Sequence, residues 1–66
     1  MIRINATEDL RARTIAKILQ DKNSILATRD LVINAAHYEG IDLKADGWDS
    51  EKTLTTIAFY ITAVTI

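Results

Sequence analysis

The chain has 66 residues, of which 48% are hydrophobic and 26% are charged, and its formal net charge is −1. This composition is typical of a folded domain and excludes a disordered segment, while the length allows one domain at most. The absence of Cys excludes disulfides and thiolate metal sites as sources of stability. A chain this short buries only about 60% of the surface that its unfolded form exposes, so we expect it to complete its core as a homodimer.

Basic and acidic residues are unevenly distributed along the chain. Residues 1–29 hold six basic and three acidic side chains, for a net charge of +3. Residues 30–66 hold two basic and six acidic side chains, for a net charge of −4. Such an asymmetry is a hint of a basic binding end, although chance scatter explains it equally well. No signal-peptide pattern and no apolar run of about 20 residues is visible, so we expect a cytoplasmic protein that does not bind membranes.

Residues 1–7 predict a short β-strand. Apolar and polar residues alternate there, which in an extended segment places the apolar ones on one face and the hydrogen-bonding ones on the other. The apolar set is Ile2, Ile4 and Ala6, and the polar set is Arg3, Asn5 and Thr7. This strand is the feature on which the predicted function depends.

Three helices are expected to follow, over residues 8–21, 24–39 and 50–63, because apolar residues recur at helical spacing in each. Thr7 is the expected cap of the first helix, and the second begins at either Ser24 or Thr28. A polar loop over residues 40–49 precedes the third helix, whose many β-branched and aromatic residues leave a strand over 53–66 as an alternative. The predicted fold is thus one domain over residues 1–66, mainly α with one short N-terminal β-strand.

Catalytic and metal-binding motifs are missing from the sequence. Its one imidazole, His37, and the nearby Glu39 point apart on a helix, so they are not expected to share a metal ion. With only Gly40 and Gly47, the chain cannot form a glycine-rich phosphate loop, and it has no nucleophile–base pair. We therefore expect no enzyme activity, no cofactor and no metal site.

The order of strand, capped helix, turn and second capped helix resembles the ribbon-helix-helix (Arc/MetJ-type) DNA-binding repressors, including their antitoxin-like members. The resemblance covers about residues 2–38. The stretches that carry it are Ile2–Thr7, then Thr7–Leu10 entering a helix, the turn Asp21–Asn23, and a second helix with Leu31, Val32 and Ala35. It implies an intertwined homodimer with a C-terminal helix added, which binds double-stranded DNA and often regulates its own operon.

This resemblance, with the chemistry of the residues, assigns three sets of site residues. Arg, Asn and Thr side chains suit base edges in the major groove, so the paired strands would read DNA with Arg3, Asn5 and Thr7. The start of the second helix would contact phosphates with Ser24, Thr28 and Arg29. The third helix would extend the dimer or bind a protein partner with Leu54, Ile57, Phe59 and Ile61.

The sequence thus predicts a small dimeric transcriptional regulator that reads the major groove with an N-terminal β-ribbon. One alternative of a different class stays open, because every feature above is also compatible with a chain that binds no nucleic acid. In that case the protein is a small α-rich protein–protein interaction module, such as an inhibitor, an adaptor or a phage-type accessory protein. Its apolar third helix would then form the contact.

Overall fold

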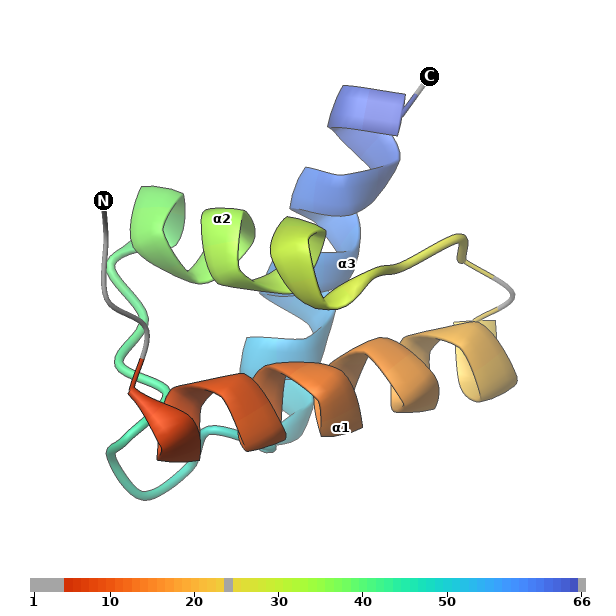
Figure 1. Ribbon diagram of the computed structural model, residues 1–66. Coiled ribbons are helices and arrows are strands. Elements are labelled where there is room, and N and C mark those ends of the chain that lie inside the picture. The colour runs from red at the N-terminus through yellow and green to blue at the C-terminus, as the bar shows by residue number, and fades with distance from the viewer. Residues whose placement is uncertain (1–4, 24, 66) are drawn as a thin grey trace.

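The computed structural model describes residues 5–23 and 25–65, which fold into three α-helices (Figure 1). They are α1 over Ala6–Asn23, α2 over Arg29–Glu39 and α3 over Glu51–Thr65. No β-strand occurs in these described residues. The described part of the chain is therefore all-α, and the predicted mainly-α fold with an N-terminal strand, paired as a ribbon-helix-helix dimer, is wrong.

The start of α1 gives the physical reason for this correction. The side-chain oxygen Oδ1 of Asn5 accepts a hydrogen bond from the backbone N–H of Thr7 at 2.8 Å. The backbone carbonyl oxygen of Asn5 accepts a hydrogen bond from the N–H of Asp9 at 2.9 Å. Asn5 is therefore the cap, and the helix begins at Ala6, inside the predicted strand. The rest of that strand, residues 1–4, lies outside the described residues.

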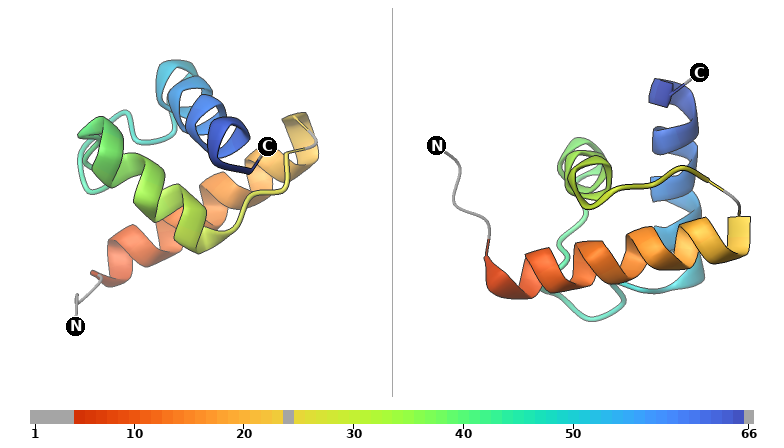
Figure 2. Two further views of the ribbon diagram at one scale, coloured as in Figure 1. Left: turned by 90° about the horizontal axis from the view of Figure 1, so that it is seen from above. Right: turned by 45° about the vertical axis from the view of Figure 1, so that its right-hand side comes forward.

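Helix α2 crosses over α1, and α3 runs across the back of both, as two further views confirm (Figures 1 and 2). Buried side chains of α1 recur at the spacing three, four and seven that places them on one face. The buried residues of these two helices are Ala12, Ile15, Ala16 and Leu19 from α1 and Val32, Ile33, Ala35 and Ala36 from α2. The many alanines among them allow the helix backbones to approach closely.

Both ends of α2 follow the predicted signals. Of the two candidate caps, Thr28 is the one used at its start, where its hydroxyl accepts the N–H of Leu31 at 3.2 Å. Gly40 ends the helix in the left-handed conformation, with φ +68°, which a glycine adopts without steric cost. The segment before Thr28 is not helical, and Gln20 holds it to α1 through a 2.6 Å hydrogen bond from Nε2 to the carbonyl of Ala27.

The loop between α2 and α3 is fixed to α1 by Arg11. Its Nη1 donates a 2.7 Å hydrogen bond to the carbonyl of Leu43, and its guanidinium carbon lies 5.1 Å from the ring centroid of Trp48. The Leu43 side chain is buried in the core. This contact brings the start of α3 to α1, where Ser50 Oγ caps the helix by accepting the N–H of Thr53 at 3.3 Å.

Residues 51–65 are helical, so the predicted third helix exists and the alternative strand does not form in this segment. Helix α3 begins one residue later and ends two residues later than the predicted range 50–63. Ile57, Ala58 and Ile61 of α3 enter the core. Their spacing of one, three and four residues, typical of a helical face, outweighs the strand preference of the individual residue types.

Candidate functional site

The structure does not bring the predicted base-reading residues together on a strand. Arg3 lies outside the described residues. Asn5 caps α1 through its side chain, and Thr7 is an exposed residue in the first turn of that helix. The polar face that the alternation predicted is therefore absent from the part of this segment that the structure describes.

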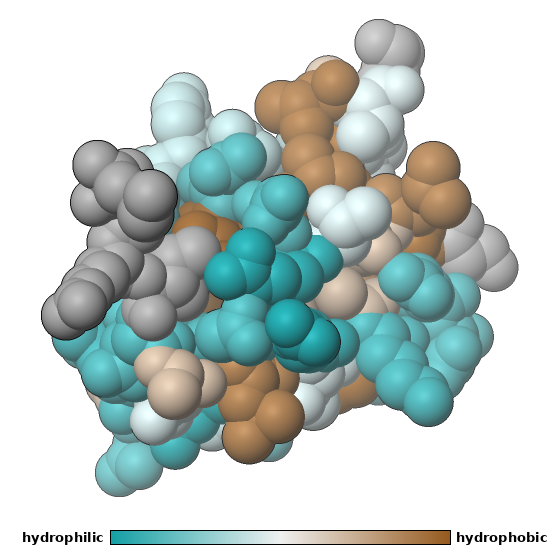
Figure 3. Space-filling view, viewed as in Figure 1, coloured by the Kyte–Doolittle hydropathy of each residue, from teal (hydrophilic) through white to brown (hydrophobic). Residues whose placement is uncertain are grey.

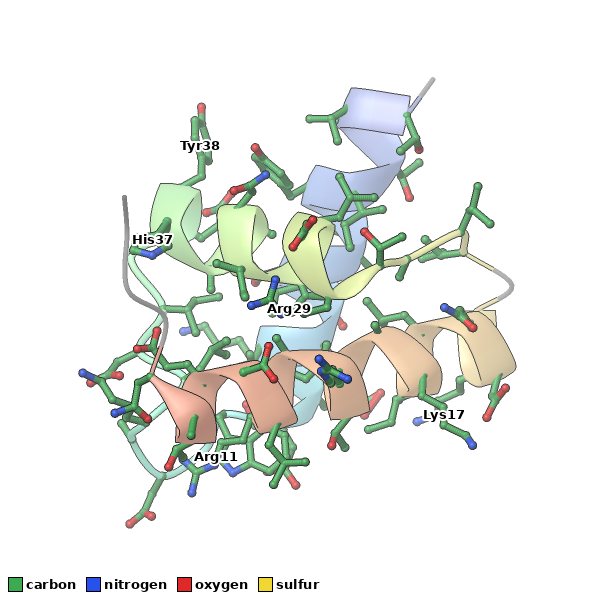
Figure 4. The ribbon with its side chains drawn as sticks, in the orientation of Figure 1. Arg11, Lys17, Arg29, His37 and Tyr38 are labelled. Carbon is green, nitrogen blue, oxygen red and sulfur yellow. The ribbon has the colours of Figure 1, made fainter. Side chains whose placement is uncertain are left out.

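The predicted phosphate-contacting residues also have structural roles. Ser24 lies outside the described residues, and Thr28 caps α2. Arg29 forms an ion pair with Asp9 of α1 and a second one, at 2.6 Å, with its neighbour Asp30 (Figure 4). Its charge is thus balanced by two carboxylates.

The pairing of Arg29 with Asp9 perturbs both groups. The hydrogen bond from Arg29 is the main cause that lowers the pKa of Asp9, and the charge of Arg13, whose Nε lies 3.1 Å from the carboxylate, lowers that pKa further. Partial burial opposes this shift. The same hydrogen bond raises the pKa of Arg29. These side chains hold α2 against α1, and Arg29 is only 33% exposed.

The residues predicted to bind a partner through the third helix are divided between two sides of α3. Ile57 and Ile61 are 0% exposed and belong to the chain's own core, which excludes them from a surface contact. Leu54 is partly buried against that core. Phe59, by contrast, is 72% exposed. Of the predicted contact residues, Phe59 is therefore the one that α3 exposes most to solvent.

Other apolar side chains surround Phe59 at the C-terminal ends of α2 and α3. Together with it they form what we call the aromatic surface, which consists of Tyr38, Phe59, Tyr60, Ala63 and Val64. These residues line an open depression beside Glu39. The rings of Tyr38 and Tyr60 are 5.2 Å apart between centroids and tilted by 43°, a favourable geometry for an aromatic pair.

Much of this surface is open to solvent. Tyr38 is 76% exposed and points away from the helices in Figure 4, and Val64 is 51% exposed. In the space-filling view, hydrophobic atoms lie beside pale, weakly polar ones on the part of α3 that stands above α2 (Figure 3). Large apolar side chains gathered on one exposed area typically mark a contact site for another molecule.

Sequence reasoning found Phe59 but missed Tyr38, Tyr60 and Val64. For Tyr60 and Val64 the available signal was the absence of any charged residue from position 53 to position 66, whereas Tyr38 lies on α2, outside this stretch. A surface helix normally carries charges on the side away from the core. Their absence from every position of this segment indicates that its outer side is uncharged, which the spacing of the core residues alone does not reveal.

Polar side chains line other depressions of the molecule. A second depression is lined by Glu8, His37, Asp42 and Lys44, with apolar residues at its base. Within residues 5–23 and 25–65, no group of three or more His, Asp or Glu side chains is placed to hold a metal ion. His37 is exposed at the end of α2, as Figure 4 shows.

Comparison with known protein families, with curated protein sequences and with solved structures finds no match to this chain. None of the helices in the described residues is long and apolar enough to cross a membrane.

Proposed function

We propose that this protein is a small helical module that binds another protein through the aromatic surface. The observation that carries the proposal is the exposed, uncharged side of α3, where Phe59 is 72% and Val64 51% exposed. A surface helix normally carries charged residues on the side away from the core. The chain's own core covers one side of α3, and a partner would cover the other.

The side chains of this surface are suited to protein contacts. Tyr, Trp and Arg side chains at the centre of an interface commonly supply most of its binding free energy, and buried Phe rings add to it. Burial of one Phe side chain favours association by about 1.5–3 kcal/mol. Tyr38 and Tyr60 add rigid rings whose hydroxyl groups can form hydrogen bonds at the edge of a contact. The depression is open, unlike the enclosed pockets that bind small molecules.

Nucleic acid is a less favoured partner because several cations of α1 and α2 already have carboxylate neighbours. Arg13 and Arg29 both pair with Asp9, and Lys22 lies 3.7 Å from Glu51. Affinity for DNA depends on cations that neutralise phosphates. The predicted DNA-reading ribbon also requires a strand that the described residues do not form.

Site-specific photocrosslinking in the cells that make the protein tests this proposal. The photoreactive residue p-benzoylphenylalanine replaces Phe59 in one variant and Leu10 in the other. Leu10 is a matched control because it is also a large exposed apolar residue, 66% exposed, but lies on α1. Irradiation is expected to give a discrete protein adduct from position 59 and not from position 10.

Two results would contradict the proposal. One is an equal, diffuse yield from both positions, which would mean that the aromatic surface is no more a contact site than the exposed face of α1. The other is an adduct at position 59 that nuclease removes, which would identify nucleic acid as the partner. The mass of a protein adduct also shows whether the partner is a second copy of the chain.

A further inference from the structure

The outer side of α3 is built like a helix-packing face. Opposite the buried Ile57 and Ile61, the exposed residues occur at separations of three and four, which places them on one side of the helix. We call this the outer face of α3, and it consists of Thr55, Phe59, Thr62 and Ala63. Phe59 and Ala63 are the residues that it shares with the aromatic surface. Small residues one turn before and after Phe59 allow a second helix to approach closely while the ring fills the space between them.

The charge of this face restricts what can cover it. No charged residue occurs between positions 53 and 66, so a charged partner would lose water from its charges without gaining an opposite charge. The partner must therefore present an uncharged helical or flat surface. A second copy of α3 does so, whereas the exposed side of α1 carries Arg13, Lys17 and Asp21.

The two ends of α3 determine the direction of a second copy. Glu51 and Lys52 lie at its start, and its last turn contains no basic residue. A parallel copy would place Glu51 beside Glu51 and Lys52 beside Lys52. In an antiparallel copy centred on Phe59, each Lys52 instead reaches the C-terminal end of the other helix, where a cation stabilises the free carbonyl groups. The negative charge of the adjacent Glu51 is offset by Lys22 of its own chain, 3.7 Å away.

Building on the proposed function, we infer that the partner is a second copy of this chain. The two α3 helices pack antiparallel through their outer faces, with the two Phe59 rings beside the two-fold axis. Such a two-fold pair uses the same surface on both chains, as most homodimers do. In this arrangement Thr55 of each chain lies opposite Ala63 of the other, since both are four residues from Phe59.

Sedimentation equilibrium of the purified protein tests the inference. We expect the wild-type chain to approach about 15 kDa with rising concentration, twice its 7.4 kDa monomer mass. Phe59→Lys is expected to raise the dimer dissociation constant by about 10-fold or more, because it places two like charges at the axis. The control Leu26→Lys, at a side chain that is 82% exposed on the α1–α2 connection, should leave the dimer unchanged.

A charge pair tests the direction of the helices. Thr55→Glu and Ala63→Lys should each weaken the dimer alone, whereas the double variant should dimerise more tightly than either single variant, because position 55 faces position 63. Failure of this rescue would overturn the antiparallel arrangement. Circular dichroism of each variant confirms that the helices still form.

The inference and the proposed function fail in different ways. A wild-type chain that stays at 7.4 kDa at every concentration overturns the second copy as the partner. If position 59 still gives a discrete adduct with a different protein in cells, the proposed function stands. If position 59 gives no more adduct than position 10, the proposed function fails as well.

Discussion

At the scale of single residues, side chains that suit nucleic acid are used here to hold helices together. Asn5 caps α1, Thr28 caps α2, and Arg29 pairs with Asp9 across the two helices. Asn and Thr bond backbone N–H groups at helix starts as readily as they bond bases. Residue type alone could not separate these roles, because the choice depends on whether residues 5–7 are extended or helical.

The capping role of Asn5 predicts opposite effects at neighbouring positions. Asn5→Ala should lower the free energy of unfolding by about 1 kcal/mol, because the N–H of Thr7 loses its acceptor. Thr7→Ala should be neutral or slightly stabilising, since Ala has the higher helix propensity. Urea denaturation of both variants measures the two values. A larger loss for Thr7→Ala would assign the cap to Thr7.

The Asp9–Arg29 pair predicts an acid-sensitive contribution to stability. The pKa of Asp9 is lowered from its ordinary value of 3.8, so the folded state binds protons less readily than the unfolded state. The stabilisation is therefore fully present above that ordinary value and is lost as the pH falls below it, through the lowered pKa.

Asp9→Asn should consequently destabilise the protein at neutral pH and have a diminishing effect as the solution is acidified. Asp21→Asn is the control, because it removes the same charge from an exposed position on the same helix. Thermal unfolding across an acid titration gives both curves. A loss for Asp9→Asn that does not change with pH would show that the ion pair is not its cause.

At the scale of helices, the sequence patterns predicted secondary structure most accurately where several signals agreed. Thr28 and Gly40 mark the two ends of α2. Helical spacing of the apolar residues predicted α3 correctly as a helix, although Thr, Ile and Val favour strands. The prediction failed at residues 5–7, where alternation over a few positions competed with a cap and an acidic first turn. A short alternation cannot be distinguished from the start of a helix when the strand's partner is unknown.

The packing of α1 against the α2–α3 loop gives an element-scale prediction. Arg11→Ala removes the bond to Leu43 and the contact with Trp48, and should lower stability by about 1–2 kcal/mol. Arg13→Ala removes an exposed pair with Asp9, worth about 0.3–0.5 kcal/mol.

Fluorescence of the single Trp, measured during urea unfolding, follows both changes. The emission of Trp48 should shift to longer wavelength in Arg11→Ala, because the ring becomes more exposed, and stay unchanged in Arg13→Ala. Equal losses of stability with the same emission would mean that Arg11 does not anchor the loop.

At the scale of the whole molecule, the helices could be predicted but not their arrangement. The apolar spacing predicted that the segments of α1 and α3 are helical, whereas the division of α3 into a buried side and an outer face required the fold. Phe59 and Ile57 are both apolar residues of one helix, and only the positions of α1 and α2 decide which of them is buried. That division is the basis of the proposed contact.

The most direct test of that contact is solvent paramagnetic relaxation, measured by NMR with a soluble gadolinium chelate. Protons that solvent reaches relax faster, so the measurement reports which residues are covered in solution. We expect Phe59 and Ala63 to be shielded at high protein concentration, as the buried Ile57 is, and to become accessible on dilution. In the Phe59→Lys protein, Ala63 should be accessible at every concentration. Enhancement at Ala63 as strong as at the exposed Leu10, at every concentration, would contradict the account.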